Sequence, residues 1–115
     1  MSETFAKLTV EELAARLASP DMENVQLIDV REPHEVEIAA LREFQNLPLS
    51  ESEQWVDSIT DRFDPNVETI VLCHHGMRSA HMCQWLIGRG FTKVYNVEGG
   101  IDAYSIVVDR SVPRY

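Results

Sequence analysis

The chain has 115 residues, 44% hydrophobic and 25% charged, which predicts a single compact domain with a core of its own. Its net charge of −9 argues against nucleic acid as the main partner. The two cysteines, Cys73 and Cys83, are too few for a disulfide framework, and their spacing matches no zinc motif. We therefore expect a free thiol in a reducing, intracellular setting.

The N-terminal residues 1–12 lack the basic segment and apolar run of a signal peptide. No stretch approaches the roughly 18 consecutive apolar residues of a membrane span. These observations predict a cytoplasmic protein that does not associate with membranes.

The first predicted helix follows residues 9–12, which read Thr-Val-Glu-Glu and have the pattern of a capping box. Apolar side chains then recur at helical spacing, and the helix is expected to end at Ser19-Pro20-Asp21. Residues 25–30 are mostly apolar and β-prone, so they predict a buried strand. Pro33 suits the first turn of a short helix, and the nearby Glu35 favours its dipole.

A short extended segment is expected over residues 44–49, and Pro48 stops it. Residues 50–53 read Ser-Glu-Ser-Glu, a second capping-box pattern that predicts the start of a helix. That helix would turn four apolar side chains inward, namely Trp55, Val56, Ile59 and Phe63. Asp64-Pro65-Asn66 then marks a turn.

Residues 69–73 are the clearest core strand of the chain, because they form an apolar, β-branched run. A helix is predicted over residues 79–89, closed by Gly88 and Gly90, and a short strand over residues 94–97. Strands that alternate with helices predict an α/β fold, in which a mostly parallel central sheet carries helices on both faces.

The loop Cys73-His74-His75-Gly76-Met77-Arg78-Ser79 follows this core strand. Ligands of open α/β sheets bind beyond the carboxyl ends of the strands, and Gly76 allows the chain to turn tightly there. Such a loop directs backbone N–H groups toward its centre, where they stabilise a thiolate or a bound oxyanion. Arg78 adds a permanent charge whose planar fork suits anionic oxygens. Cys73 is therefore the predicted nucleophile.

The charge pattern around this loop is unusual for so acidic a chain. No Asp or Glu lies between Thr69 and Val97, whereas Arg78, Arg89 and Lys93 do. A positive region of this kind suggests a local anion site. A buried strand followed by an amphipathic helix would produce the same pattern without any site.

The pattern Cys-x-x-Gly-x-Arg-Ser between an apolar strand and a helix resembles the active-site loop of the rhodanese family of sulfurtransferases. Residues 27–33 resemble the family's first signature, and residues 97–101 with Tyr104 resemble its last, where Trp is more usual. The resemblance runs from about Lys7 to Tyr104 and implies one rhodanese-like domain over residues 1–115. Its core would span about 7–104, followed by a tail at 105–115.

Two segments depart from the family pattern. Residues 39–44 stand where rhodaneses commonly show Gly-His-Ile and a later Gly-Ala, so the geometry of that turn is expected to differ. His74 replaces the Arg that frequently follows the family's cysteine, and it either tunes the choice of donor or points outward. The spacing from Cys73 to Arg78 is one residue shorter than the loop of cysteine-dependent phosphatases, and this favours sulfur transfer.

The resemblance implies that Cys73 attacks the outer sulfur of thiosulfate or of another persulfide donor, after which sulfite leaves. Cyanide, a small thiol or a partner protein's cysteine would then take the sulfur from the Cys73 persulfide. The substrate-binding residues implied are the rest of the loop: His74, His75, Gly76, Met77, Arg78 and Ser79. No metal or organic cofactor is implied.

Two other functions remain open from the sequence. The domain could be a low-turnover persulfide carrier or regulatory module for a protein partner, or a small phosphatase or arsenate reductase.

Asp29 and Arg31 are expected to support the loop as an ion pair or through hydrogen bonds. Cys83 is interpreted as a small buried side chain and His75 as exposed. A metal site among the His and Cys residues of 73–83 is disfavoured, since one loop and one helix converge them poorly.

Overall fold

The computed structural model describes residues 5–20 and 24–115. The elements follow in this order: β1 (Ala6–Leu8), α1 (Val10–Leu17), β2 (Gln26–Asp29), α2 (Pro33–Ile38), β3 (Gln45–Asn46), the 3-10 turns η2 (Leu49–Gln54) and η3 (Val56–Ser58), α3 (Ile59–Arg62), β4 (Thr69–Leu72), α4 (Met77–Gly88), β5 (Val94–Val97) and α5 (Gly100–Val107). Strands and helices alternate through most of the chain, as an α/β fold requires.

The five strands form one sheet in the order β1-β5-β4-β2-β3, and every pair is parallel. The central strand β4 pairs with β2 from Gln26↔Thr69 to Asp29↔Leu72 and with β5 on its other side. All four β4 residues are buried, which explains their continuous apolar pattern. The predicted fold class is therefore confirmed, with a sheet that is parallel throughout.

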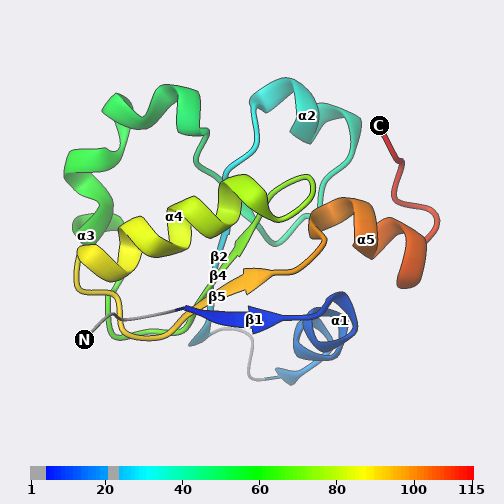
Figure 1. Cartoon of the computed structure of the whole chain (residues 1–115), viewed down its shortest axis with the longest axis horizontal. Helices are drawn as coiled ribbons and strands as arrows, with labels where there is room; N and C mark the ends of the chain where they lie inside the picture. The colour runs from blue at the N-terminus through cyan, green and yellow to red at the C-terminus, as the bar shows by residue number, and fades with distance from the viewer. Residues whose placement is uncertain (1–4, 21–23) are drawn as a thin grey trace.

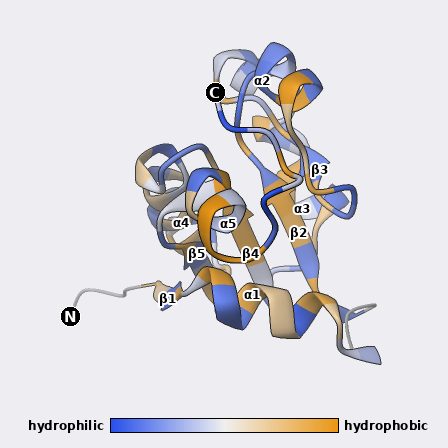
Figure 2. Cartoon of the chain, turned by 90° about the vertical axis from the view of Figure 1, so that its right-hand side faces the viewer, coloured by the Kyte–Doolittle hydropathy of each residue, from blue (hydrophilic) through white to orange (hydrophobic). Residues whose placement is uncertain are grey.

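Two apolar layers cover the two faces of this sheet. One layer packs α3, α4 and the η2–η3 segment on sheet residues such as Ile28 and Val71. The other packs α1 and α5 on sheet residues such as Ile70 and Leu72. Figure 1 shows α4 and α1 on opposite sides of the strands, and Figure 2 shows hydrophobic residues concentrated along β2 and β4.

The predicted capping box of the first helix is confirmed. The Thr9 hydroxyl accepts from the Glu12 N–H at 3.1 Å, and the Glu12 carboxylate accepts from the Thr9 N–H at 2.9 Å. The helix ends at Leu17. Asp21 of the predicted stop lies outside the described residues, while the strand at β2 and the short helix that opens with Pro33 both form as expected.

The helix predicted to begin at residues 50–53 is wrong. The segment forms two 3-10 turns instead, and the α-helix covers only Ile59–Arg62. The Ser50 hydroxyl donates to the Glu32 carboxylate rather than capping a helix, and Glu51 has non-helical backbone angles. The inward direction of the apolar residues is nevertheless confirmed: Trp55 and the other predicted core residues here are buried or packed against the core.

Two elements were not predicted from the sequence. The edge strand β1 has only three residues and is defined by pairing with β5, a contact that no local pattern encodes. Helix α5 begins at Gly100. Its buried residues Ile101, Tyr104 and Ser105 have helical spacing, but the glycines at its start do not favour a helix, so the sequence did not predict one. After α5 the chain continues toward α2, where it ends (Figure 1). No helix among the described residues has both the length and the apolar character needed to cross a membrane.

Candidate active site

Cys73 directly follows β4, at the carboxyl edge of the sheet, and its residue surface is 1% exposed. Its Sγ atom accepts a hydrogen bond from one backbone N–H of the loop that follows and lies near a hydroxyl. The Gly76 N–H lies 3.0 Å from the sulfur and the Ser79 hydroxyl 3.2 Å from it. A backbone donor directed at the sulfur stabilises a negative charge on it. We call residues 73–79 the cradle.

The non-helical part of the cradle is two residues shorter than the sequence predicted, because α4 begins at Met77 rather than at Ser79. Gly76 has a φ of 101° and serves as the helix N-cap, which lets the chain enter the helix at once. Met77 and Arg78 therefore lie in the first turn of α4. Met77 is 71% exposed, so its side chain lies at the surface beside the cradle.

A buried polar pair supports the cradle from the neighbouring strand. The Asn96 side chain in β5 donates to the Gly76 carbonyl at 3.1 Å, and its carbonyl oxygen lies 2.5 Å from the Ser79 hydroxyl. Ser79 has a single hydroxyl proton, and the Asn96 carbonyl oxygen, which can only accept, lies closer to it than Cys73 Sγ does. The buried Ser79 hydroxyl therefore donates to Asn96, and its oxygen faces Cys73. Asn96 was not predicted as a site residue, although a single amide side chain in an apolar strand was a usable signal.

The N-terminus of α5 packs against the cradle through two backbone hydrogen bonds. The Ile101 N–H donates to the Cys73 carbonyl at 2.9 Å, and the Asp102 N–H donates to the His74 carbonyl at 3.1 Å. Gly100 has a φ of 62°, and a Cβ atom there would lie 2.4 Å from the Cys73 carbonyl oxygen. A residue with a side chain at position 100 therefore could not let the helix approach the cradle this closely.

Arg31 and Asp29 lie behind the opposite side of the site and form the predicted ion pair, with Nη2 and Oδ2 2.7 Å apart. Both residues are buried. All five N–H groups of Arg31 have acceptors: the Asp29 carboxylate twice, the carbonyls of Glu35 and Ala39, and the Tyr115 hydroxyl. Arg31 therefore has no donor left for a substrate.

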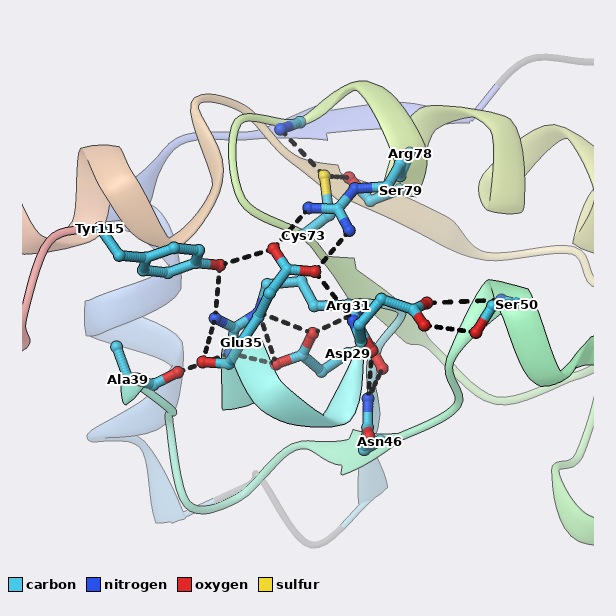
Figure 3. Close-up of polar contacts among 12 residues, drawn as sticks. Asp29, Arg31, Glu35, Ala39, Asn46, Ser50, Cys73, Arg78, Ser79 and Tyr115 are labelled. Carbon is cyan, nitrogen blue, oxygen red and sulfur yellow. Dashed lines mark hydrogen bonds and ion pairs between the residues drawn. The ribbon is translucent and has the colours of Figure 1, made fainter. Parts of the chain in front are cut away.

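Glu35 contacts Arg78 through two parallel hydrogen bonds of 2.7 and 2.9 Å (Figure 3). The Arg78 guanidinium holds the pKa of Glu35 down to about 2, against the opposing effect of burial, and Glu35 raises the pKa of Arg78 in return. From the sequence, Glu35 was expected only to interact favourably with the dipole of its helix. Its pairing depends on the distance between α2 and α4, which the sequence does not encode.

Tyr115 joins the site from the C-terminal tail. Its ring stacks on His74 with centroids 3.9 Å apart and planes at 8°. Its hydroxyl accepts from Arg31 Nη1 at 2.8 Å and donates to Glu35 at 3.0 Å (Figure 3). Burial raises the pKa of the phenol, so it stays protonated and able to donate. We call Asp29, Arg31, Glu35 and Tyr115 the wall. No pattern in the tail pointed to Tyr115.

His74 and His75 both belong to the cradle, but their surroundings differ. His74 is stacked between His75 and Tyr115, and its buried Nε2 atom has no hydrogen-bond partner in the part of the chain that the structure describes. Burial and the neighbouring His75 lower the pKa of His74, so it is neutral at physiological pH. His75 is exposed, as predicted, and its Nε2 lies 3.8 Å from Asp102.

His74, His75 and Asp102 bring potential metal-ligating atoms within 4.8 Å of one another. The two imidazoles are stacked at a centroid distance of 3.9 Å, so their lone pairs do not converge on one point. Asp102 already accepts from Arg114 at 2.9 Å. These residues fit a metal ion poorly.

Cys83 is fully buried in α4, and burial raises its thiol pKa to about 12, as suits a packing residue.

Comparison with known proteins agrees with this arrangement. The family model described as Rhodanese-like domain matches residues 9–106. The rhodanese-like/PpiC domain-containing protein 12, chloroplastic, of Arabidopsis thaliana is 46% identical over 114 residues, which are 98% of this chain and 38% of that protein. This chain thus spans well under half of that relative.

A shorter relative is matched over most of its length. The thiosulfate sulfurtransferase GlpE of Vibrio cholerae is 30% identical over 90 residues, which cover 78% of this chain and 81% of that protein. A crystal structure of a rhodanese-like domain protein from Staphylococcus aureus superposes with a TM-score of 0.76 at 24% identity. That match covers 96% of this chain and 99% of the other, and it supports the fold.

Proposed function

The chain belongs to the rhodanese-like domain family, and from this premise we propose that it is a sulfurtransferase whose Cys73 carries sulfane sulfur as a persulfide. The observation that carries the proposal is the Gly76 N–H that donates to Cys73 Sγ at the entry to α4. This donor and the N-terminus of α4 suit both the thiolate that attacks and the persulfide anion that forms.

In the first step the Cys73 thiolate attacks the outer sulfur of the donor. The donor's S–S bond breaks, and its electron pair leaves with sulfite when the donor is thiosulfate, or with a thiolate when it is a hydropersulfide. In the second step cyanide, a small thiol or a protein thiolate attacks the outer sulfur of the Cys73 persulfide. Thiocyanate or a new persulfide forms, and the Cys73 thiolate is restored.

The relatives support the general reaction. The Vibrio cholerae relative is named a thiosulfate sulfurtransferase, and one from Allochromatium vinosum, 30% identical over 95 residues, is named a sulfurtransferase. We propose thiosulfate or a persulfide as donor, and a thiol or cyanide as acceptor. The cytoplasmic location expected from the sequence stays a prediction, since the Arabidopsis relative is named chloroplastic.

A second candidate function is a persulfide carrier or regulatory module that serves a protein partner with little turnover of its own. Met77 favours it, because a methionine that is 71% exposed beside the reactive sulfur offers apolar contact to a docking protein. The name of the Arabidopsis relative, which joins a rhodanese-like domain to a PpiC domain, is consistent with work alongside another module.

The test measures thiocyanate formation from thiosulfate or an organic persulfide with cyanide, together with intact mass after donor treatment. We expect one added sulfur on the wild-type protein, none on Cys73→Ser, and wild-type loading on the control Cys83→Ser, which removes the buried thiol. Loading with negligible turnover would favour the carrier function. Equal loading of Cys73→Ser, or efficient hydrolysis of an aryl phosphate, would overturn the proposal.

A further inference from the structure

The arginine side chains around Cys73 are already paired with carboxylates, and this affects which sulfur donor the site accepts. Arg78 is the cation of the cradle, and both of its terminal nitrogens hold the Glu35 carboxylate. Arg31 has acceptors for all of its donors, and the ion pair between Arg114 and Asp102 lies beside the cradle. Each of these three guanidinium groups therefore has its own carboxylate.

Glu35 is held firmly in this position. It is 8% exposed, and besides Arg78 its carboxylate accepts from the Tyr115 hydroxyl at 3.0 Å and from the Glu32 N–H at 2.9 Å. Because its pKa is about 2, the carboxylate stays charged across the physiological range and does not release Arg78 by taking up a proton. The neutral His74 adds no compensating positive charge.

We propose that Glu35 determines donor specificity. By occupying the Arg78 guanidinium, it makes the site select sulfane-sulfur donors of low charge, of the hydropersulfide class R–S–SH, over the thiosulfate dianion. This inference rests on the proposed sulfur transfer through Cys73. A dianion near Cys73 meets the carboxylate of Glu35, and the guanidinium groups of Arg31, Arg78 and Arg114 are each already paired with a carboxylate. The persulfide group of a hydropersulfide carries at most one negative charge.

The chemistry at the sulfur is the same for both kinds of donor. The Cys73 thiolate attacks the outer sulfur, the S–S bond breaks, and the electron pair departs with the inner sulfur. From R–S–SH the leaving group is the thiolate R–S⁻, and the Cys73 thiolate becomes the hydropersulfide Cys–S–SH. From thiosulfate the leaving group is sulfite, and the Cys73 thiolate becomes the persulfide anion Cys–S–S⁻. The proposal thus concerns binding of the donor, since the bonds that change are equivalent.

The experiment compares thiosulfate with methanethiosulfonate, in which a methyl group replaces one anionic oxygen. Both donors present the same outer sulfur, but methanethiosulfonate carries one negative charge less. The measured quantity is the ratio of the second-order rate constants with which the two donors load sulfur on Cys73, followed by intact mass. This ratio is taken for the wild type, Glu35→Gln and the matched control Glu37→Gln, which removes an exposed carboxylate from the same helix.

We expect the wild type to prefer methanethiosulfonate. Glu35→Gln keeps an acceptor for Tyr115 but frees Arg78, so it should raise the rate constant for thiosulfate about tenfold relative to that for methanethiosulfonate. Glu37→Gln should change the ratio by less than about twofold, because solvent and salt screen its charge. Loss of a merely structural contact would slow both donors alike and leave the ratio unchanged.

A second variant covers the case in which Glu35→Gln does not fold. Glu35→Asp keeps the charge but withdraws the carboxylate from Arg78 by one methylene, and we expect a shift of about threefold in the same direction. An unchanged ratio in a folded Glu35 variant would overturn the inference while leaving sulfur transfer intact. Failure of both donors to load wild-type Cys73 would instead contradict the proposed function.

Discussion

The cradle and the wall meet at Arg78, and they are built from different groups. The cradle acts through backbone: the Gly76 N–H at the sulfur, the helix entry at Gly76, and the α5 amides on the carbonyls of Cys73 and His74. The wall acts through side chains that come from β2, the connection after it, α2 and the tail. The difference suggests that the cradle supports the reaction itself, whereas the wall adjusts stability and the choice of donor.

The largest effect is expected from Gly100→Ala, which breaks the cradle. The new Cβ would lie 2.3 Å from the His74 carbonyl oxygen, and the backbone there has a φ of 62°. We expect a loss of about 4 kcal/mol in the free energy of unfolding and little sulfur loading on Cys73. Denaturant unfolding and intact mass measure the two effects.

The control is Gly88→Ala at the end of α4, where a Cβ meets nothing within 4 Å. It should leave loading unchanged and raise stability by about 0.5 kcal/mol, because Ala favours a helix over Gly. Equal stability of the two alanine variants would show that the close approach of α5 does not matter.

The next effect tests whether the wall contributes structure through Arg31. Arg31→Met leaves the buried Asp29 carboxylate without its partner and should lower stability by about 3 kcal/mol. Adding Asp29→Asn should restore part of that loss. Arg78→Met should lower stability by clearly less than Arg31→Met does, since the Arg78 side chain is 37% exposed. A larger loss from Arg78→Met in denaturant unfolding would contradict the contrast between the two arginines.

A third effect is the dependence of folding stability on pH that Glu35 confers. Its pKa is about 2 in the folded chain against 4.5 for an unperturbed glutamate. A depressed pKa contributes stability that is complete above about pH 4.5 and is lost as pH falls toward 2. Over that window the wild type should lose about 2 kcal/mol more than Glu35→Gln does. Parallel pH profiles of the two proteins would contradict this role.

The smallest effect is expected from Tyr115→Phe. It removes the hydroxyl that bridges Arg31 and Glu35 but keeps the ring stacked on His74. We expect a loss of about 1 kcal/mol, measured by denaturant unfolding, with Cys73 loading retained. Tyr115→Ala should cost more, because it also removes the stack. Identical stabilities of the Phe and Ala variants would show that the ring contributes nothing.

The sequence predicted the parts of the site whose signal is local. Cys73 and Gly76 follow a strand that was recognisable from its apolar run, and the ion pair of Asp29 and Arg31 joins residues two positions apart. The helix expected from residues 50–53 failed although its pattern was also local, because the Glu32 carboxylate takes the hydroxyl that would have capped it. A pattern within one segment cannot show which side chain of another segment will compete for its donors.

What the sequence by itself determined was the parallel α/β fold and the position of the proposed nucleophile Cys73 after a strand, since apolar periodicity and a glycine turn are properties of neighbouring residues. What only the tertiary structure decided was the environment of Cys73. Glu35 lies 43 positions from Arg78, and Tyr115 lies 80 positions from Glu35. Their contacts depend on how α2, α4 and the tail pack around the sheet, and the net charge beside Cys73 follows from that packing.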